Sequence, residues 1–512
     1  MIINYLLAII SGASLTLAFA PFRFWPISFV SLISLICIFA KQQSLKNSFY
    51  VGFMFGLGFF ATSVSWVFVS IYKYGGTSII LAVFITALFV IFLSIFPGIN
   101  LYLLKKFKLN LPLDWRFLLA FPASWVLLEI FRGWFLTGFP WALLGYTQLN
   151  SSLKYYASLF GVYGVSFIVA FIASLSANLL FKIKHKFNNN LFVISSLILL
   201  IFAVPLLYTK NKKNYCLENN TNTVAIIQGN INPDDKFLFQ DPASLIKRVS
   251  EIYVQSSEKI IADYNKLNKK IDLILWPENS MPLEVHHPAA NTFLYKLHQF
   301  ASANNVGLLL GVPINYEHNY NYFYNSVLGL GAAQGVYHKI NLVPFGDYVP
   351  LENVLRGLIN FFNLPLSSFV AGPLKQRAIK FNNYALLATV CYDIAYAENL
   401  RTRVLADNPS VIIAVSEDGW FGDSLGPSQH LDIARMRAIE TGRYILRATT
   451  SGVSAVIDNY GNIVKQVPMF KRSILVSEYK NCFTQTIWNK LGNSFIIVFL
   501  LTCWLISIYK SS

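Results

Sequence analysis

Long apolar runs dominate the first 208 residues of the chain. Seven of them cover residues 3–20, 26–40, 51–72, 77–104, 117–134, 158–181 and 191–208. Several reach the ~20 residues that a helix needs to cross ~30 Å of hydrocarbon. One more apolar run, from Ser494 to Ile508, lies near the carboxyl end. The pattern therefore predicts a multi-span α-helical membrane domain with about eight transmembrane helices.

The first apolar run allows two interpretations. Ala18-Phe19-Ala20 resembles the small-residue cleavage site of a signal peptide. The run has no basic start, however, and Pro21 follows it directly, so a retained helix is favoured.

Lysines in the short loops predict how the helices are oriented. Three groups of lysines fall in alternate loops. The first group is Lys41 and Lys46, the second is Lys105, Lys106 and Lys108, and the third is Lys182, Lys184 and Lys186. Since cytoplasmic loops carry the excess of basic residues, these loops and both termini are expected in the cytoplasm. A further cluster at Lys210, Lys212 and Lys213 lies on the opposite side in this scheme, and the three loops outweigh it.

The middle of the chain has a different pattern, in which short β-rich runs alternate with helical ones. Buried strands are predicted at residues 224–228, 271–276, 306–312, 385–391 and 411–416, and helices at 242–267 and 429–441. Such alternation is typical of a layered α/β domain whose sheets are covered by helices. The chain is thus expected to divide into residues 1–208, 209–490 and 491–512.

The charge distribution agrees with this division. The formal net charge is +16, which by itself is typical of a nucleic-acid-binding protein. The outer segments hold 14 Lys and Arg against two acidic residues, whereas residues 209–490 hold 27 against 23. The excess therefore belongs to membrane loops, and no nucleic-acid partner is expected.

Cysteine and histidine spacings predict neither a disulfide framework nor a metal site. The five cysteines are widely and irregularly spaced, and two of them, Cys37 and Cys503, lie in apolar runs. The seven histidines show no metal-ligand spacing. We expect no metal and no cofactor.

Three residues, two of them at the ends of predicted strands and one in a loop, are candidates for chemistry. Cys391 ends an apolar run, Glu278 follows Trp276-Pro277, and Lys339 lies in a loop rich in aromatic residues and prolines. Each has an ordinary alternative, since the cysteine can be a buried hydrophobe, the glutamate a cap and the lysine a solvated surface residue. Together they cover the roles of acyl transfer: a thiol nucleophile, a base that takes its proton, and a cation that stabilises an oxyanion with the backbone N–H of Tyr392.

Two other segments have open interpretations. Glu129 and Arg132, spaced i, i+3 near a membrane boundary, form either a structural ion pair or a contact with a lipid headgroup. The proline-flanked segment 350–373 is either a mobile lid or a rigid loop.

These motifs resemble a known family. Trp276-Pro277-Glu278, Lys339 and Cys391-Tyr392 are similar to the Glu-Lys-Cys triad of the nitrilase, or carbon-nitrogen hydrolase, superfamily, whose fold is an αββα sandwich. Four further segments of this chain look like motifs of the apolipoprotein N-acyltransferase family. These segments are residues 132–141, 343–350, 420–424 and 429–438. The resemblance covers nearly the whole chain and implies eight spans around one periplasmic domain in a bacterial inner membrane.

The resemblance implies a two-step acyl transfer. Cys391 would attack the sn-1 ester of a phospholipid, preferably phosphatidylethanolamine, and pass the acyl chain to the α-amine of a diacylglyceryl-cysteine at a lipoprotein amino terminus. It assigns Glu278 as base, Lys339 as oxyanion partner and Cys391 as nucleophile. Supporting acids would be Asp347 and Asp393, and residues near the substrate would be Arg132, Phe237, Tyr348 and Trp420.

The sequence departs from the family pattern at several of these positions. Asp347 and Asp393 stand where the family often has Glu, and Phe237 stands at what looks like a tryptophan position. Asn279 replaces a small hydroxyl residue, and Glu417 stands where asparagine is common. None of these changes removes a triad role.

Two other functions fit parts of the pattern. A membrane-anchored nitrilase-type amidase would pass its thioester to water, but it would have no need for eight spans. A transporter with a large extracytoplasmic binding domain is disfavoured, because the spans contain few ionisable residues that could line a path.

Overall fold

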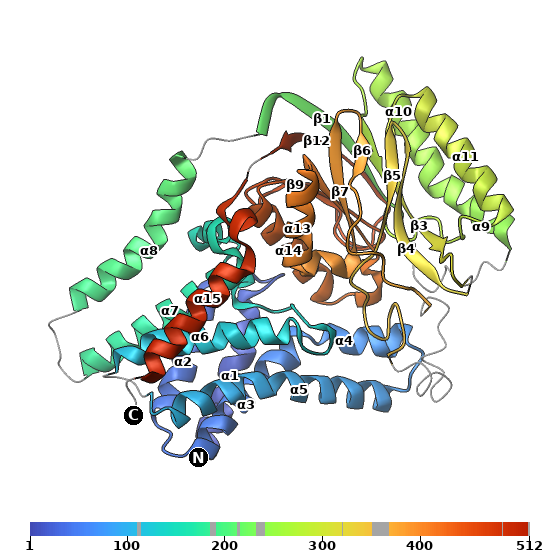
Figure 1. Cartoon of the computed structure of the whole chain (residues 1–512). Coiled ribbons are helices and arrows are strands. Elements are labelled where there is room, and N and C mark those ends of the chain that lie inside the picture. The colour runs from blue at the N-terminus through green and yellow to red at the C-terminus, as the bar shows by residue number, and fades with distance from the viewer. Residues whose placement is uncertain are drawn as a thin grey trace.

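The computed structural model describes residues 1–109, 114–184, 191–211, 216–231, 241–319, 321–350, 368–483 and 485–509. They form a helical domain and a β-sandwich domain, here called the sandwich domain (Figure 1). The chain enters the sandwich domain after α8 and leaves it before α15.

Every predicted apolar run is helical. The helices are α1 (Ile2–Leu15), α2 (Pro26–Ala40), α3 (Leu45–Ser63), α4 (Trp66–Val69), α5 (Ile79–Lys106), α6 (Trp115–Arg132), α7 (Ala157–Lys184), α8 (Leu191–Asn211) and α15 (Ile487–Tyr509). Both termini lie at the end of this bundle that is remote from the sandwich domain (Figure 1).

The number of membrane spans is only partly supported. Among the described residues, three helices are long and apolar enough to cross a membrane, and they cover Ile79–Lys106, Ser152–Ile183 and Ile487–Tyr509. The bent pair Leu45–Ser63 and Trp66–Tyr74, with a 51° angle, would be a fourth. Other apolar helices are shorter, and α6 carries three charged residues, Arg116, Glu129 and Arg132. A count of about eight is not confirmed.

The sandwich domain contains both the predicted strands and strands that the sequence patterns did not single out. They are β1 (Cys216–Gln228), β2 (Leu273–Leu275), β3 (Gly307–Asn315), β4 (Phe323–Gly331), β5 (Ala333–His338), β6 (Ile379–Phe381), β7 (Tyr384–Val390), β8 (Val411–Ser416), β9 (Tyr444–Thr449), β10 (Ala455–Ile457), β11 (Ile463–Gln466) and β12 (Ser473–Cys482). Their order is β11-β10-β9-β8-β7-β6-β5-β4-β3-β2-β1-β12. Only two residue pairs join β5 to β6, so the strands form two halves that face each other.

Three apolar cores hold the layers together. One lies between the two halves of the sheet and includes Leu275, Leu386 and Ile413. A second packs α9 (Pro242–Val249), α10 (Gln255–Lys266) and α11 (Pro288–Ala303) on one outer face. The third joins the other outer face, with α13 (Ala397–Asp407) and α14 (Gly426–Thr441), to the helical domain. The arrangement is the predicted αββα sandwich (Figure 1).

Helix α14 is buried along its whole length. All 16 of its residues are buried, although many of them are polar or charged. Its charged side chains therefore pair inside the protein, as Asp432 does with Arg23 of the helical domain at 3.0 Å. This helix lies between the sheets and the membrane helices, so it fixes the position of the sandwich domain on the bundle.

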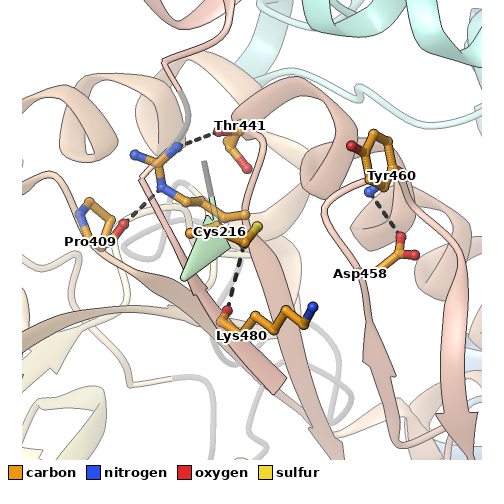
Figure 2. Close-up of a disulfide and its surroundings, with 8 residues drawn as sticks. Cys216, Pro409, Thr441, Asp458, Tyr460 and Lys480 are labelled. Carbon is orange, nitrogen blue, oxygen red and sulfur yellow. Dashed lines mark hydrogen bonds between the residues drawn. A yellow bond between two sulfur atoms is a disulfide. The ribbon is translucent and has the colours of Figure 1, made fainter. Parts of the chain in front are cut away.

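A disulfide joins Cys216 to Cys482, which corrects the prediction of no disulfide (Figure 2). The two cysteines are 266 residues apart, at the start of β1 and the end of β12. They are direct partners in the antiparallel ladder between these strands. The pairing was not predictable from spacing because it depends on two strands from opposite ends of the domain becoming neighbours.

Candidate active site

The candidate residues lie at the ends of neighbouring strands in the two halves of the sheet. Glu278 follows β2, Lys339 follows β5, Cys391 follows β7 and Glu417 follows β8. Strands β2 and β3 are parallel to β1, and β7, β8 and β9 are parallel to each other. Carboxyl ends of parallel strands commonly form a ligand site, and Glu278 and Cys391 follow such strands. Lys339 follows β5, which is antiparallel to both of its neighbours, β4 and β6. The three predicted triad residues lie close enough for the charges of each to influence the pKa of the others.

Glu278 is buried, and both of its carboxylate oxygens accept hydrogen bonds. Oε1 accepts from Nδ2 of Asn325 at 2.6 Å, and Oε2 accepts from the backbone N–H of Glu417 at 2.7 Å. Gly311 makes this position possible, because a Cβ there would lie 2.6 Å from the Glu278 backbone. The carboxylate is therefore held in one orientation.

Lys339 is 1% exposed and lies between two carboxylates. Its Nζ is 2.7 Å from Oδ2 of Asp347 and 3.8 Å from Oε1 of Glu278. Asp347 Oδ2 also accepts from the backbone N–H of Val343 at 2.7 Å, which closes the loop around the lysine. Asp347 is thus paired with the lysine, and its role as a supporting acid stays a prediction.

Cys391 is partly exposed and has an unusual backbone conformation. Its φ is +50°, in the left-handed region that non-glycine residues rarely adopt. The chain turns sharply there, from β7 into the short helix Cys391–Ala395. Such strained positions are common at functional sites.

Burial, more than the neighbouring charges, opposes ionisation of the thiol. Burial, and then the charge of Glu278, raise the pKa of Cys391, while Lys339 lowers it and is outweighed. Burial also raises the pKa of Glu278 against the effect of Lys339. Burial alone would lower the pKa of Lys339, but Asp347, Cys391 and Glu278 outweigh it and the net shift is upward. The charged form of the lysine and the neutral form of the thiol are therefore favoured, so the thiol needs a base that takes its proton when it attacks.

Asp393 connects the Cys391 turn to the segment after Lys339. Its Oδ2 accepts from the hydroxyl of Tyr337 at 2.8 Å, and its Oδ1 accepts from the backbone N–H of Asn341 at 2.7 Å. These two hydrogen bonds join the segments on either side of the site, and the role of Asp393 as a supporting acid stays a prediction.

A loop of the helical domain contacts the Cys391 turn. The hydroxyl of Tyr392 donates to the carbonyl of Gly138 at 3.2 Å, and that of Tyr396 donates to Thr137 at 2.9 Å. Tyr348 is also hydrogen-bonded to Thr137. Tyr348, which was predicted near the substrate, therefore lies with Tyr392 and Tyr396 where the site meets the helical domain.

Trp420 and Arg132 also lie at this boundary. The carbonyl of Trp420 accepts from Oγ of Ser70 at 2.8 Å, and its ring lies against Tyr74. Arg132 is 4% exposed, and its guanidinium donates to the carbonyl of Trp141 at 2.8 Å. This burial favours a structural role for Arg132 over a headgroup contact. Phe237, and residues 351–367 of the predicted lid, lie outside the described residues.

Several residues of the site were not singled out as candidates. Asn325 lies on β4, and no local signal marks it. Ser416 ends the apolar strand β8 and Asp418 lies two residues after it, and that signal was available. In the described part of the chain, no group of three His, Cys, Asp or Glu residues has the geometry of a metal site.

Comparisons with solved structures find proteins of the nitrilase type. An amidase from Nesterenkonia matches 56% of this chain and 97% of its own, with 15% identity and a TM-score of 0.38. A carbon-nitrogen hydrolase from Helicobacter pylori matches 50% of this chain and 88% of its own, with 17% identity and a TM-score of 0.37.

Sequence comparisons cover far more of the chain. Residues 11–175 match the family described as the apolipoprotein N-acyltransferase N-terminal domain, and residues 223–481 match carbon-nitrogen hydrolase. The apolipoprotein N-acyltransferase of Pseudomonas putida is 36% identical over 92% of this chain and 90% of its own. That of Pasteurella multocida is 35% identical over 97% and 93%. The chain belongs to the apolipoprotein N-acyltransferase family.

Proposed function

We propose that this protein is an apolipoprotein N-acyltransferase that moves an acyl chain through a thioester on Cys391. The observation that carries the proposal is the similarity to curated enzymes of this name over more than nine-tenths of the chain. The acyl donor is the sn-1 ester of a phospholipid, with phosphatidylethanolamine as the preferred headgroup. The acceptor is the α-amine of the diacylglyceryl-cysteine at a lipoprotein amino terminus.

In the first half-reaction Glu278 takes the thiol proton as Cys391 attacks the ester carbonyl. The oxyanion that forms accepts hydrogen bonds from Nζ of Lys339 and from the backbone N–H of Tyr392. When the C–O bond breaks, Glu278 returns the proton to the departing alkoxide. The products are an acyl thioester and a lysophospholipid.

In the second half-reaction the free α-amine of the lipoprotein attacks the thioester carbonyl. Glu278 takes a proton from the attacking nitrogen, and the same two donors stabilise the second oxyanion. The C–S bond then breaks, and the thiolate recovers the proton from Glu278. An amide and the free enzyme result, which makes the reaction ping-pong.

The position of the site supports a lipid donor. The turn that carries Cys391 contacts the loop at residues 137–138, which belongs to the helical domain. Aromatic side chains of both domains meet there, and the ring centroids of Trp141 and Tyr392 are 6.4 Å apart. A site at this boundary can receive the ester of a phospholipid that stays in the membrane. The lipid is then held beside the thiol and does not have to cross water to reach it.

The first test looks for the acyl thioester. After exposure to phosphatidylethanolamine in detergent micelles, the peptide that contains Cys391 is expected to gain the mass of one acyl chain, because the ester carbon becomes bonded to sulfur. Mass spectrometry measures the gain, and hydroxylamine should remove it. The Cys391→Ala variant should gain nothing, and acylation of that variant would contradict the assignment.

The same assay separates transfer from hydrolysis. Adding a diacylated lipopeptide should discharge the thioester into a triacylated lipopeptide. An amidase-type enzyme would release free fatty acid and form no triacylated product.

We also propose a topology for the chain. Eight spans in residues 1–208 and 491–512 hold residues 209–490 in the periplasm, with both termini in the cytoplasm. Three features support it: the lysine-rich alternate loops, the two termini at one end of the bundle (Figure 1), and the disulfide. Structural disulfides form in oxidising compartments, and the bacterial periplasm is one.

Reporter insertions test this topology. A reporter enzyme that is active only after export should be inactive when it is inserted into the loop after α2, near Gln42. The same reporter should be active when it is inserted into the loop after α10, near Asn268. A cytoplasmic fluorescent reporter should show the opposite pattern. Both sites on one side of the membrane would contradict the proposal.

A further inference from the structure

A buried charged cluster lies directly behind the nucleophile, and the proposed reaction does not use it. Its members are Ser416, Asp418, His430 and Arg447, and each is at most 1% exposed. They come from the end of β8, the turn after it, α14 and β9. Because burying charges is costly, such a cluster needs a reason.

The cluster is built around the carboxylate of Asp418. Its Oδ1 accepts from Oγ of Ser416 at 2.6 Å and lies 2.9 Å from Nδ1 of His430. Its Oδ2 accepts from Nη2 of Arg447 at 2.6 Å. The imidazole is thus held on one edge by charged groups that are themselves fixed.

The other edge of the imidazole faces the nucleophile. Nε2 of His430 lies 3.2 Å from the carbonyl oxygen of Cys391. Since a carbonyl oxygen can only accept, Nε2 must carry the hydrogen. Nδ1 then accepts from Nη2 of Arg447 at 3.1 Å when the ring is neutral, or donates to Asp418 when it is charged. The bond to Cys391 is the same in both states.

The carbonyl of Cys391 belongs to the same peptide group as the N–H of Tyr392. A trans peptide is planar, and its C=O and N–H point in opposite directions. A donor that holds the oxygen therefore also fixes the direction of the N–H. A hydrogen bond to the oxygen further polarises the group, which strengthens the N–H as a donor.

We propose that His430 is a positioning residue that aims the Tyr392 N–H at the oxyanion by holding the carbonyl of Cys391. The left-handed φ of +50° at Cys391 makes such a hold necessary, because this conformation is unfavourable for a residue with a side chain. Arg447 and Asp418 serve to fix the imidazole. The inference rests on the proposed function, in which the Tyr392 N–H is an oxyanion donor.

Two substitutions of His430 separate this role from general packing. The side-chain amide nitrogen of glutamine in His430→Gln lies where Nε2 was, so it can still donate to the Cys391 carbonyl. The amide nitrogen of asparagine in His430→Asn lies where Nδ1 was, so it can reach Asp418 but not the carbonyl. If His430 only neutralised Asp418, the asparagine variant would be at least as active as the glutamine variant.

Two reactions of the same thiol give the readout, in a background with free Cys37 and Cys503 replaced by alanine. Single-turnover thioester formation from phosphatidylethanolamine passes through an oxyanion, whereas alkylation of Cys391 by iodoacetamide does not. We expect His430→Asn to slow acylation at least about 30-fold. His430→Gln should slow it by no more than about five-fold. Alkylation should change by less than about three-fold in both variants.

Each contrary outcome has a definite meaning. Wild-type acylation rates in His430→Asn, equal losses in both variants, or a parallel loss of alkylation would each overturn the inference. A wild-type protein that is alkylated but never acylated would instead overturn the proposed function. Partial unfolding lowers the amplitude of a single turnover and not its rate constant. Should the asparagine variant not accumulate, a fall of more than about five-fold in the ratio of acylation to alkylation in His430→Gln would overturn the inference.

Discussion

Lys339→Met is expected to abolish acyl transfer and to destabilise the sandwich domain at the same time. Methionine keeps the length of the side chain and removes its charge, so the oxyanion loses one of its two donors. We expect the rate of thioester formation to fall by about 10³-fold. Asp347, 2.7 Å from the lysine, would then be buried without its cation, and the cost of breaking such a pair is about 3–5 kcal/mol.

A double variant separates the two effects. Lys339→Met combined with Asp347→Asn leaves no uncompensated charge at Asp347, while the asparagine oxygen can still accept from the N–H of Val343. We expect Tm in detergent to fall by about 10 °C in the single variant and to recover most of that loss in the double variant. Thioester formation should stay about 10³-fold slower than in the wild type in both variants. A single variant that keeps more than a tenth of the activity would show that the charge of Lys339 is not needed.

Removal of the disulfide is the second large effect that we expect. Cys216→Ala with Cys482→Ala opens a covalent loop that encloses the whole sandwich domain, since the two residues are 266 positions apart. The bond restricts the unfolded chain far more than the folded one, and its loss should cost about 4–5 kcal/mol of unfolding free energy. In the folded protein the ladder between β1 and β12 keeps the strands paired, so thioester formation at 25 °C should be retained.

Thermal unfolding with and without reductant measures this effect. The wild-type protein should unfold at a lower temperature when a reductant is present, because reduction acts on the unfolded chain, in which the two buried sulfurs become accessible. The double-alanine variant should show the lower Tm in both conditions. Cys37→Ala, which removes a free cysteine of α2, is the matched control and should respond to reductant as the wild type does. An unchanged Tm in the double variant would mean that the bond does not stabilise the domain.

The local patterns predicted elements well where one physical rule decides the outcome. Apolar runs became helices, and β-rich runs such as Val411–Ser416 became buried strands. The count of spans is different, because length and composition mark only three helices as sufficient among the described residues. Burial of α1, α2 and α6 depends on their neighbours, and a sequence pattern contains no information about neighbours.

The candidate site divides in the same way. Glu278 and Cys391 could be predicted because each follows an apolar run and carries a reactive group, and parallel strands bring such ends together. Lys339 could be predicted only from its place in a loop rich in aromatic residues and prolines and from the family resemblance. Asn325 and His430 could not be assigned a role, because each depends on one side chain reaching a particular atom of a distant element. Their contacts, at 2.6 Å to Glu278 and 3.2 Å to Cys391, span 47 and 39 positions of the chain.

The sequence by itself determined the helical membrane part, the layered α/β part, the three reactive groups and the family resemblance. These depend on periodicity, residue chemistry and motif spacing, which are local properties. The tertiary structure decided the Cys216–Cys482 bond, the burial of Arg132 and the cluster behind Cys391. Each of these is a contact between elements far apart in the chain, and such contacts exist only after the layers have packed and set the distances between them.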